Sequence, residues 1–171
     1  MLKVVRLINS SWLIGSVVFG GLDVKKYKGN LVKRPIIPRT ESPDGLTRFW
    51  IYLDGITVNQ PDGTIVPVYE TDPQAKGQPM VLDSGSPLSA LPAGIYTELV
   101  AAFPNKRRVY TEFGPLYEVN CPGPGDGGSL DFTFGDKIIN VPYYDFVWHS
   151  RGASNICVLG AYATGRLVPY L

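Results

Sequence analysis

The stretch "MVLDSGSPLSALP", Met80 to Pro92, places one aspartate behind three apolar residues and ahead of Ser, Gly and Ser. A lone carboxylate is costly to bury, so it needs hydrogen-bond donors or a partner that shares its charge. Residues 80–82 predict a buried strand that delivers Asp83 to a turn, where Gly85 allows a close backbone approach. Ser84 and Ser86 can donate hydroxyl protons to the carboxylate or to a facing copy of the turn.

The segments around this motif predict an all-β domain, mainly antiparallel, with one or two short helices. Between Pro92 and Phe103, apolar residues four positions apart predict an amphipathic helix directly after the motif. A hairpin is predicted over residues 48–70 and another over 130–142, with the dipeptide Gly135-Asp136 at its turn. Further strands are predicted at residues 16–20, 31–37, 143–148 and 156–161.

Composition and charge exclude several classes of protein. The chain has 171 residues, of which 16 are basic and 15 acidic, so the net charge of +1 gives no field that attracts nucleic acid or anionic lipid. The amino-terminal run from Met1 to Leu22 is apolar but interrupted by glycines, and it lacks a small-residue cleavage site. It favours a strand over a signal peptide and is too short and broken for a membrane span.

Two cysteines and one histidine allow few metal-ligating patterns. Cys121 and Cys157 alone do not complete a tetrahedral site, and His149 lies eight residues before Cys157 without finger-like spacing. We therefore expect no metal site, and we expect His149 to lie in a loop with an incidental or structural role. The spacing leaves two states open for the cysteines, a buried free pair or one disulfide.

The motif and its flanks resemble a known family. The pattern consists of two apolar residues followed in order by Asp-Ser-Gly-Ser, "LSALP" and a helix. It is similar to the active-site loop of the pepsin-like aspartic peptidases, in particular that of their second, carboxy-terminal lobe. The order of other segments agrees: "GSVVFGGLDVKKYKG", "FWIYLDGITV", "YEVNC", "LDFTFGDKIINVP" and "CVLGA" resemble successive parts of that lobe. The resemblance implies the fold of a single lobe, a fungal-type secreted or vacuolar member, and no cofactor.

The resemblance also implies roles for individual residues. Asp83 corresponds to a catalytic aspartate, and Ser84, Gly85 and Ser86 to residues that support the active-site loop, with Ser86 bonded to the outer carboxylate oxygen. Pro87 stands at the rim of the substrate groove, where the family usually has Ser or Thr. The segment Val158–Gly160 corresponds to the apolar-apolar-Gly element beneath the loop. Cys121 and Cys157 correspond to the disulfide of that lobe, which implies an exported setting.

Catalysis in this family needs two aspartates that share one proton, and each lobe supplies one. This sequence contains one such motif and no recognisable flap. We therefore expect an aspartic endopeptidase domain that is inactive alone and acts on polypeptides once the missing first lobe is supplied by a longer parent chain or a separate chain.

Two alternatives remain: a homodimer of single lobes, and a noncatalytic binding, decoy or nonfunctional domain. The predicted boundaries are an unmatched segment 1–12, the second-lobe domain 13–161 and a divergent, truncated tail 162–171. The expected location is extracellular, cell-wall or vacuolar.

Overall fold

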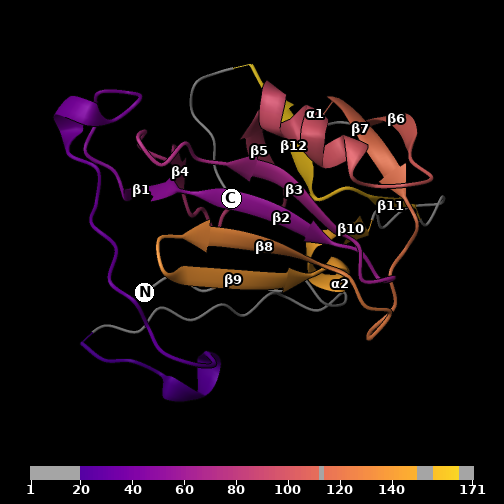
Figure 1. The fold of residues 1–171 in the computed structure, drawn as a ribbon, viewed down its shortest axis with the longest axis horizontal. Coiled ribbons are helices and arrows are strands. Elements are labelled where there is room, and N and C mark those ends of the chain that lie inside the picture. Colours follow the sequence, from indigo (N-terminus) through magenta and orange to yellow (C-terminus); the bar gives the residue numbers. More distant parts are fainter. Residues whose placement is uncertain (1–19, 112–113, 150–155, 166–171) are drawn as a thin grey trace.

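A computed structural model describes residues 20–111, 114–149 and 156–165 of the chain. Its largest feature is an antiparallel sheet in the order β3-β2-β8-β9, which crosses the middle of the molecule (Figure 1). The strands are β2 (Gly55–Asn59), β3 (Ile65–Glu70), β8 (Ser129–Phe134) and β9 (Lys137–Pro142). The two predicted hairpins are confirmed, and their turns contain Gly63 and Gly135 with φ angles of 87° and 61°, a conformation that favours glycine.

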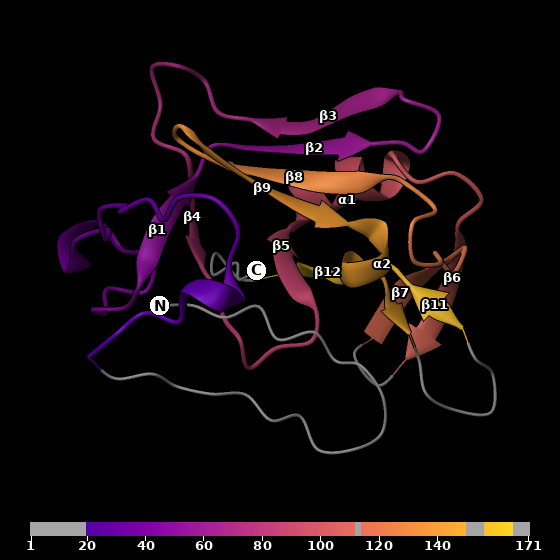
Figure 2. The same ribbon diagram turned by 90° about the horizontal axis from the view of Figure 1, so that it is seen from below.

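A second layer packs against this sheet (Figure 2). It consists of helix α1 (Ala93–Ala101) and the parallel pair β5 (Ser89–Pro92) and β12 (Ala161–Thr164). Helix α1 contacts β3 as well as β5 and β12. It begins after Pro92 as predicted, and it buries four residues, Ile95, Tyr96, Leu99 and Val100. The helix predicted to follow the Asp83 motif therefore contributes these side chains to the core.

The remaining strands lie at the two ends of these layers. Strands β1 (Trp50–Leu53) and β4 (Gln78–Val81) form an antiparallel pair. A four-stranded sheet has the order β10-β11-β7-β6. Its strands are β6 (Arg107–Thr111), β7 (Gly114–Val119), β10 (Trp148–His149) and β11 (Cys157–Val158).

Residues 48–58 form two strands instead of the single strand that was predicted. The chain passes from the β1–β4 pair to the central sheet at Asp54, whose N–H donates to Thr133 O at 2.8 Å. The carboxylate of Asp54 accepts a hydrogen bond from Gly135 N at 2.6 Å, so the crossover is tied to the β8–β9 turn. A polar residue within an apolar run thus marks the change of sheet.

The predicted strand at residues 31–37 is wrong. This segment is irregular, and Ile37 N–H donates to Trp50 O at 2.8 Å at its end. Pro35 has no N–H to donate, which explains why a ladder does not form. Two short 3₁₀ turns, η1 (Val24–Lys26) and η2 (Arg39–Glu41), flank the segment. The predicted strand at 16–20 falls almost entirely outside the described residues.

The predicted strand at residues 143–148 is also wrong, because most of this segment forms helix α2 (Tyr143–Phe146). One helical turn directs Tyr143 toward Phe103 and Phe146 toward Phe132, with ring centroids 5.0 and 6.3 Å apart. Packing of these rings overrides the preference of aromatic residues for strands. His149, predicted to lie in a loop, is the last residue of strand β10.

The fold class is confirmed: most described elements are antiparallel strands, accompanied by two short α-helices. Within the described ranges, no helix has the length and apolar character that crossing a bilayer requires.

Candidate active site

Asp83 lies in an exposed turn between strands β4 and β5. Met80, fully buried in β4, anchors the strand that leads to the turn. The carboxylate is held locally, since Gly85 N–H donates to Asp83 Oδ1 at 2.8 Å. A Cβ atom added at Gly85 would lie 3.2 Å from the same oxygen, so glycine leaves room for the carboxylate against the backbone. The carboxylate is thereby oriented without being buried.

Ser86 stabilises the loop in a different way from the one predicted. Its hydroxyl donates to Leu88 O at 2.7 Å and accepts from Leu88 N–H at 3.4 Å. The single hydroxyl proton is therefore directed to the backbone and not to Asp83. Leu88 is 3% exposed and packs with Leu116 and Val158. Ser86 therefore ties the loop to a small apolar cluster beneath it.

The segment Val158–Gly160 supports the carboxyl end of the loop. Val158 and Leu159 are fully buried, and Gly160 O accepts a hydrogen bond from Ser89 N at 2.9 Å, where β5 begins. A Cβ atom at Gly160 would lie 1.8 Å from Phe146 O, so only glycine fits between α2 and β5. The base of the turn is thus fixed by two chain segments that are distant in sequence.

The two other predicted loop residues are on the surface. Ser84 is exposed beside Asp83, and the structure gives its hydroxyl no partner among the described residues. Pro87 is exposed at a bend that follows Ser86. The structure therefore gathers residues 83–87 in one exposed loop on a buried base.

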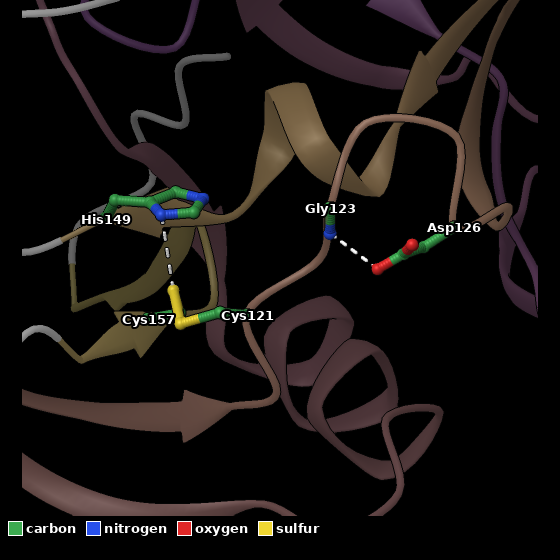
Figure 3. The surroundings of a disulfide bond; sticks show 5 residues. All are labelled: Cys121, Gly123, Asp126, His149 and Cys157. Carbon is green, nitrogen blue, oxygen red and sulfur yellow. Dashed lines mark hydrogen bonds between the residues drawn. A yellow bond between two sulfur atoms is a disulfide. The ribbon is translucent and has the colours of Figure 1, made fainter.

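Cys121 and Cys157 form a disulfide, with their Cα atoms 5.1 Å apart (Figure 3). Cys157 is buried in β11, whereas Cys121 is exposed just after β7. The alternative of a free pair is excluded, because both cysteines of the chain are in this bond.

Sequence reasoning missed the position of His149. In the antiparallel pair β10–β11 this residue lies directly opposite Cys157, and its Nδ1 atom is 3.4 Å from Cys157 Sγ. The imidazole also meets the ring of Tyr144 edge-on, with centroids 6.2 Å apart. Only the strand register reveals this cluster, since the eight-residue spacing carries no signal of it.

A surface depression of about 470 Å³ lies elsewhere, beside strands β2 and β3. Asp54, Glu70 and Asp72 contribute to its lining, whereas residues 83–87 do not. The depression is therefore separate from the Asp83 loop.

Comparison with known proteins agrees with this arrangement. The family model described as "Eukaryotic aspartyl protease" matches residues 5–168. Candidapepsin-2 of Candida parapsilosis is 29% identical over 157 residues, which cover 89% of this chain and 32% of the relative. Aspartic proteinase 3 of Saccharomyces cerevisiae is 30% identical over 165 residues, which cover 92% and 26%. Secreted aspartic protease 9 of Candida albicans is 27% identical over 147 residues, which cover 85% and 25%.

The chain thus spans only about a quarter to a third of the length of these relatives. The family match nevertheless includes nearly all of its residues, the Asp83 loop and both cysteines among them. On these grounds, the chain belongs to the eukaryotic aspartyl protease family.

Proposed function

We propose that the chain is one catalytic half of an aspartic endopeptidase, in which Asp83 is one member of a pair of aspartates. The second aspartate comes from outside these 171 residues, because the sequence contains no second motif of the same kind. In such a pair two nearby carboxylates share one proton; one activates a water molecule and the other protonates the peptide carbonyl or the leaving nitrogen. The isolated chain is therefore inactive.

The observation that carries this proposal is the contrast between the exposed carboxylate and its buried base. The acid of a shared pair must face outward until its partner arrives, yet it must be held in a fixed position, since misplacement by about 1 Å lowers catalysis strongly. Asp83 is exposed, whereas Met80, Leu88 and Leu159 under the loop are 3% exposed or less.

The neighbouring residues take roles that fit this geometry. Gly85 N–H orients one carboxylate oxygen at 2.8 Å and leaves the other free for water. The exposed hydroxyl of Ser84 is placed to bond the facing loop of the partner half. Pro87 forms part of the rim along which a polypeptide substrate lies.

The surface of the amino-terminal part of the domain supports a large partner. Among the described residues eleven large hydrophobic side chains are exposed, and seven of them belong to residues 22–49. They are Leu22, Val24, Leu31, Val32, Ile36, Leu46 and Phe49. Exposed apolar side chains gathered in one segment favour an interaction surface. We propose that residues 13–161 act as the second lobe and that a first lobe, in a longer parent chain or a separate chain, covers this segment.

The proposed location is extracellular, cell-wall or vacuolar. The disulfide supports a compartment in which thiols are oxidised. The name of the Candida albicans relative describes a secreted protease, which agrees with the same proposal.

A second candidate function, a noncatalytic binding domain, is favoured by one observation. Asp83 makes the same local hydrogen bond as Asp72: each Oδ1 accepts from the backbone N–H two residues later, at Gly85 and Gln74, at 2.8 Å. Both aspartates are exposed, so the turn itself does not distinguish a catalytic from a structural residue.

Replacement of the matched segment of candidapepsin-2 by this chain separates the two candidates. We expect the isolated chain to leave an unfolded protein substrate uncleaved at mildly acidic pH and the chimera to cleave it. Cleavage by the isolated chain would contradict the requirement for an outside half, unless sedimentation showed a homodimer. A folded chimera without activity would favour the binding domain.

A further inference from the structure

We propose that reduction of the Cys121–Cys157 disulfide converts it, together with His149, into a binding site for a thiophilic divalent metal ion such as Zn²⁺. The inference does not depend on the proposed proteolysis. One ligand atom from each of these residues already lies within 4.8 Å of the other two. Two thiolates and one imidazole form a ligand set that Zn²⁺ prefers, with the fourth position left to water.

The distance between His149 and Cys157 suits this ion without rearrangement. Zn–S bonds of about 2.3 Å and Zn–N bonds of about 2.0–2.1 Å in a tetrahedron place sulfur and nitrogen about 3.5 Å apart. In the structure His149 Nδ1 lies 3.4 Å from Cys157 Sγ. The strand register maintains this distance, because the two residues are directly opposite in β10 and β11, and β11 is also paired with β7. Two of the three ligands are therefore preorganised.

Cys121, the third ligand, can move as far as metal binding requires after reduction. After reduction, the two sulfur atoms have to separate to about 3.8 Å to share one tetrahedral ion. Cys121 is exposed and lies between β7 and the irregular segment 122–128, so it can move outward without breaking a strand ladder. Figure 3 shows the imidazole facing the sulfur pair, while Asp126 points away from it toward Gly123. Asp126 is therefore not the fourth ligand.

The chemistry balances with one reductant. A dithiol transfers two electrons and two protons to the disulfide, which becomes two thiols, and is itself oxidised to a disulfide. Binding of the metal ion to the two thiols then releases both protons to water. The ion replaces the covalent bond between the segment after β7 and strand β11.

The test uses the whole chain reduced by a water-soluble phosphine, which consumes one water molecule, becomes a phosphine oxide and leaves no competing thiol. Addition of Co²⁺ should give the intense visible bands of a tetrahedral thiolate site at one ion per chain, and Zn²⁺ should abolish them. The chain has one His and two Cys, so no other such residues compete. The oxidised chain should show no such bands.

Variants identify the ligands. His149→Gln should weaken Zn²⁺ binding at least tenfold, whereas Asp126→Asn, in the same region, should change it less than about twofold. In thermal melts of the reduced chain, Zn²⁺ at 100 times its Kd should raise the Tm by about 5 °C or more, and His149→Gln should abolish that rise at the same concentration.

The proposal is overturned if the oxidised chain binds Co²⁺ with the same spectrum or if His149→Gln binds as tightly as the unchanged chain. It is equally overturned if the reduced chain fails to fold in the presence of stoichiometric Zn²⁺, because the preorganised pair would then be absent.

Discussion

Replacement of Gly160 by alanine tests whether the base of the Asp83 loop depends on a close backbone approach. The added methyl carbon would lie 1.8 Å from Phe146 O and 2.9 Å from Phe146 C. Both atoms belong to the backbone at the end of α2, so no rotation of a side chain relieves the overlap. The φ angle of Gly160 lies outside the left-handed region, which means that the lack of space is the only obstacle.

The expected loss of stability in Gly160→Ala follows from these contacts. Overpacking in a core costs about 1–3 kcal/mol and more where the backbone has to move. We expect Gly160→Ala to lower the free energy of unfolding by at least about 3 kcal/mol, which for a chain of this size lowers the Tm by about 6 °C or more. The change also displaces the carbonyl that accepts the hydrogen bond of Ser89 N, so strand β5 should lose protection from hydrogen exchange.

Gly94→Ala is the matched control. Gly94 is in helix α1, and a Cβ atom there meets nothing within 4 Å. Alanine in a helix is favoured over glycine by up to about 1 kcal/mol, so this variant should melt at the same temperature or higher. Differential scanning calorimetry of both variants measures the contrast. A Tm for Gly160→Ala within about 2 °C of the unchanged chain would refute the argument.

Three further outcomes are expected. Replacing Cys121 and Cys157 by alanine removes a bond across 36 positions and should cost about 4 kcal/mol in the chain-entropy model; an unchanged melting temperature would contradict this. Tyr96→Phe should leave stability unchanged or raise it, because the buried Tyr96 hydroxyl lacks a partner among the described residues. Tyr143→Phe loses a 3.2 Å hydrogen bond to Gln60 Oε1 and should cost about 1 kcal/mol of stability. Equal melting temperatures of the two variants would contradict this difference. Burial raises the pKa of Tyr96 and of Tyr143 from 10.0 to about 12, so these tyrosines ionise at lower pH in the unfolded chain than in the folded one. The free energy of unfolding should therefore fall as the pH rises from 10 to 12. In denaturant titrations, the fall should be smaller for a variant in which both residues are phenylalanine.

Local features of the chain were predictable from sequence. The two hairpins follow from alternating strands joined by short turns, and Gly63 and Gly135 have the positive φ angles that such turns require. Helix α1 follows from a four-residue apolar spacing after Pro92. In each case the interactions that form the element join residues that are near in sequence.

Features that depend on distant segments were not predictable in the same way. The aromatic residues 143–148 favoured a strand, but contacts of Tyr143 with Phe103 and of Phe146 with Phe132 stabilise a helical turn. The position of His149 beside Cys157 depends on the register of two strands whose pairing no local pattern encodes.

In the candidate site, too, some features were predictable from the local sequence and others were not. The sequence predicts a strand that ends at Asp83 and a glycine that approaches its carboxylate, and Gly85 N–H does donate to it. It does not reveal that the proton of Ser86 goes to Leu88 O, because a hydroxyl can donate to a carboxylate or to a backbone carbonyl and only the folded loop selects between them.

The most direct test of the central proposal is the kcat/KM of the candidapepsin-2 chimera at mildly acidic pH, with Asp83→Asn compared against Asp72→Asn. Each substitution removes the charge of an exposed carboxylate whose Oδ1 accepts from the backbone N–H two residues later at 2.8 Å. We predict that Asp83→Asn lowers kcat/KM between about a hundredfold and ten-thousandfold while Asp72→Asn leaves it within about twofold. Equal activity of the two variants would show that the carboxylate at position 83 takes no part in proteolysis.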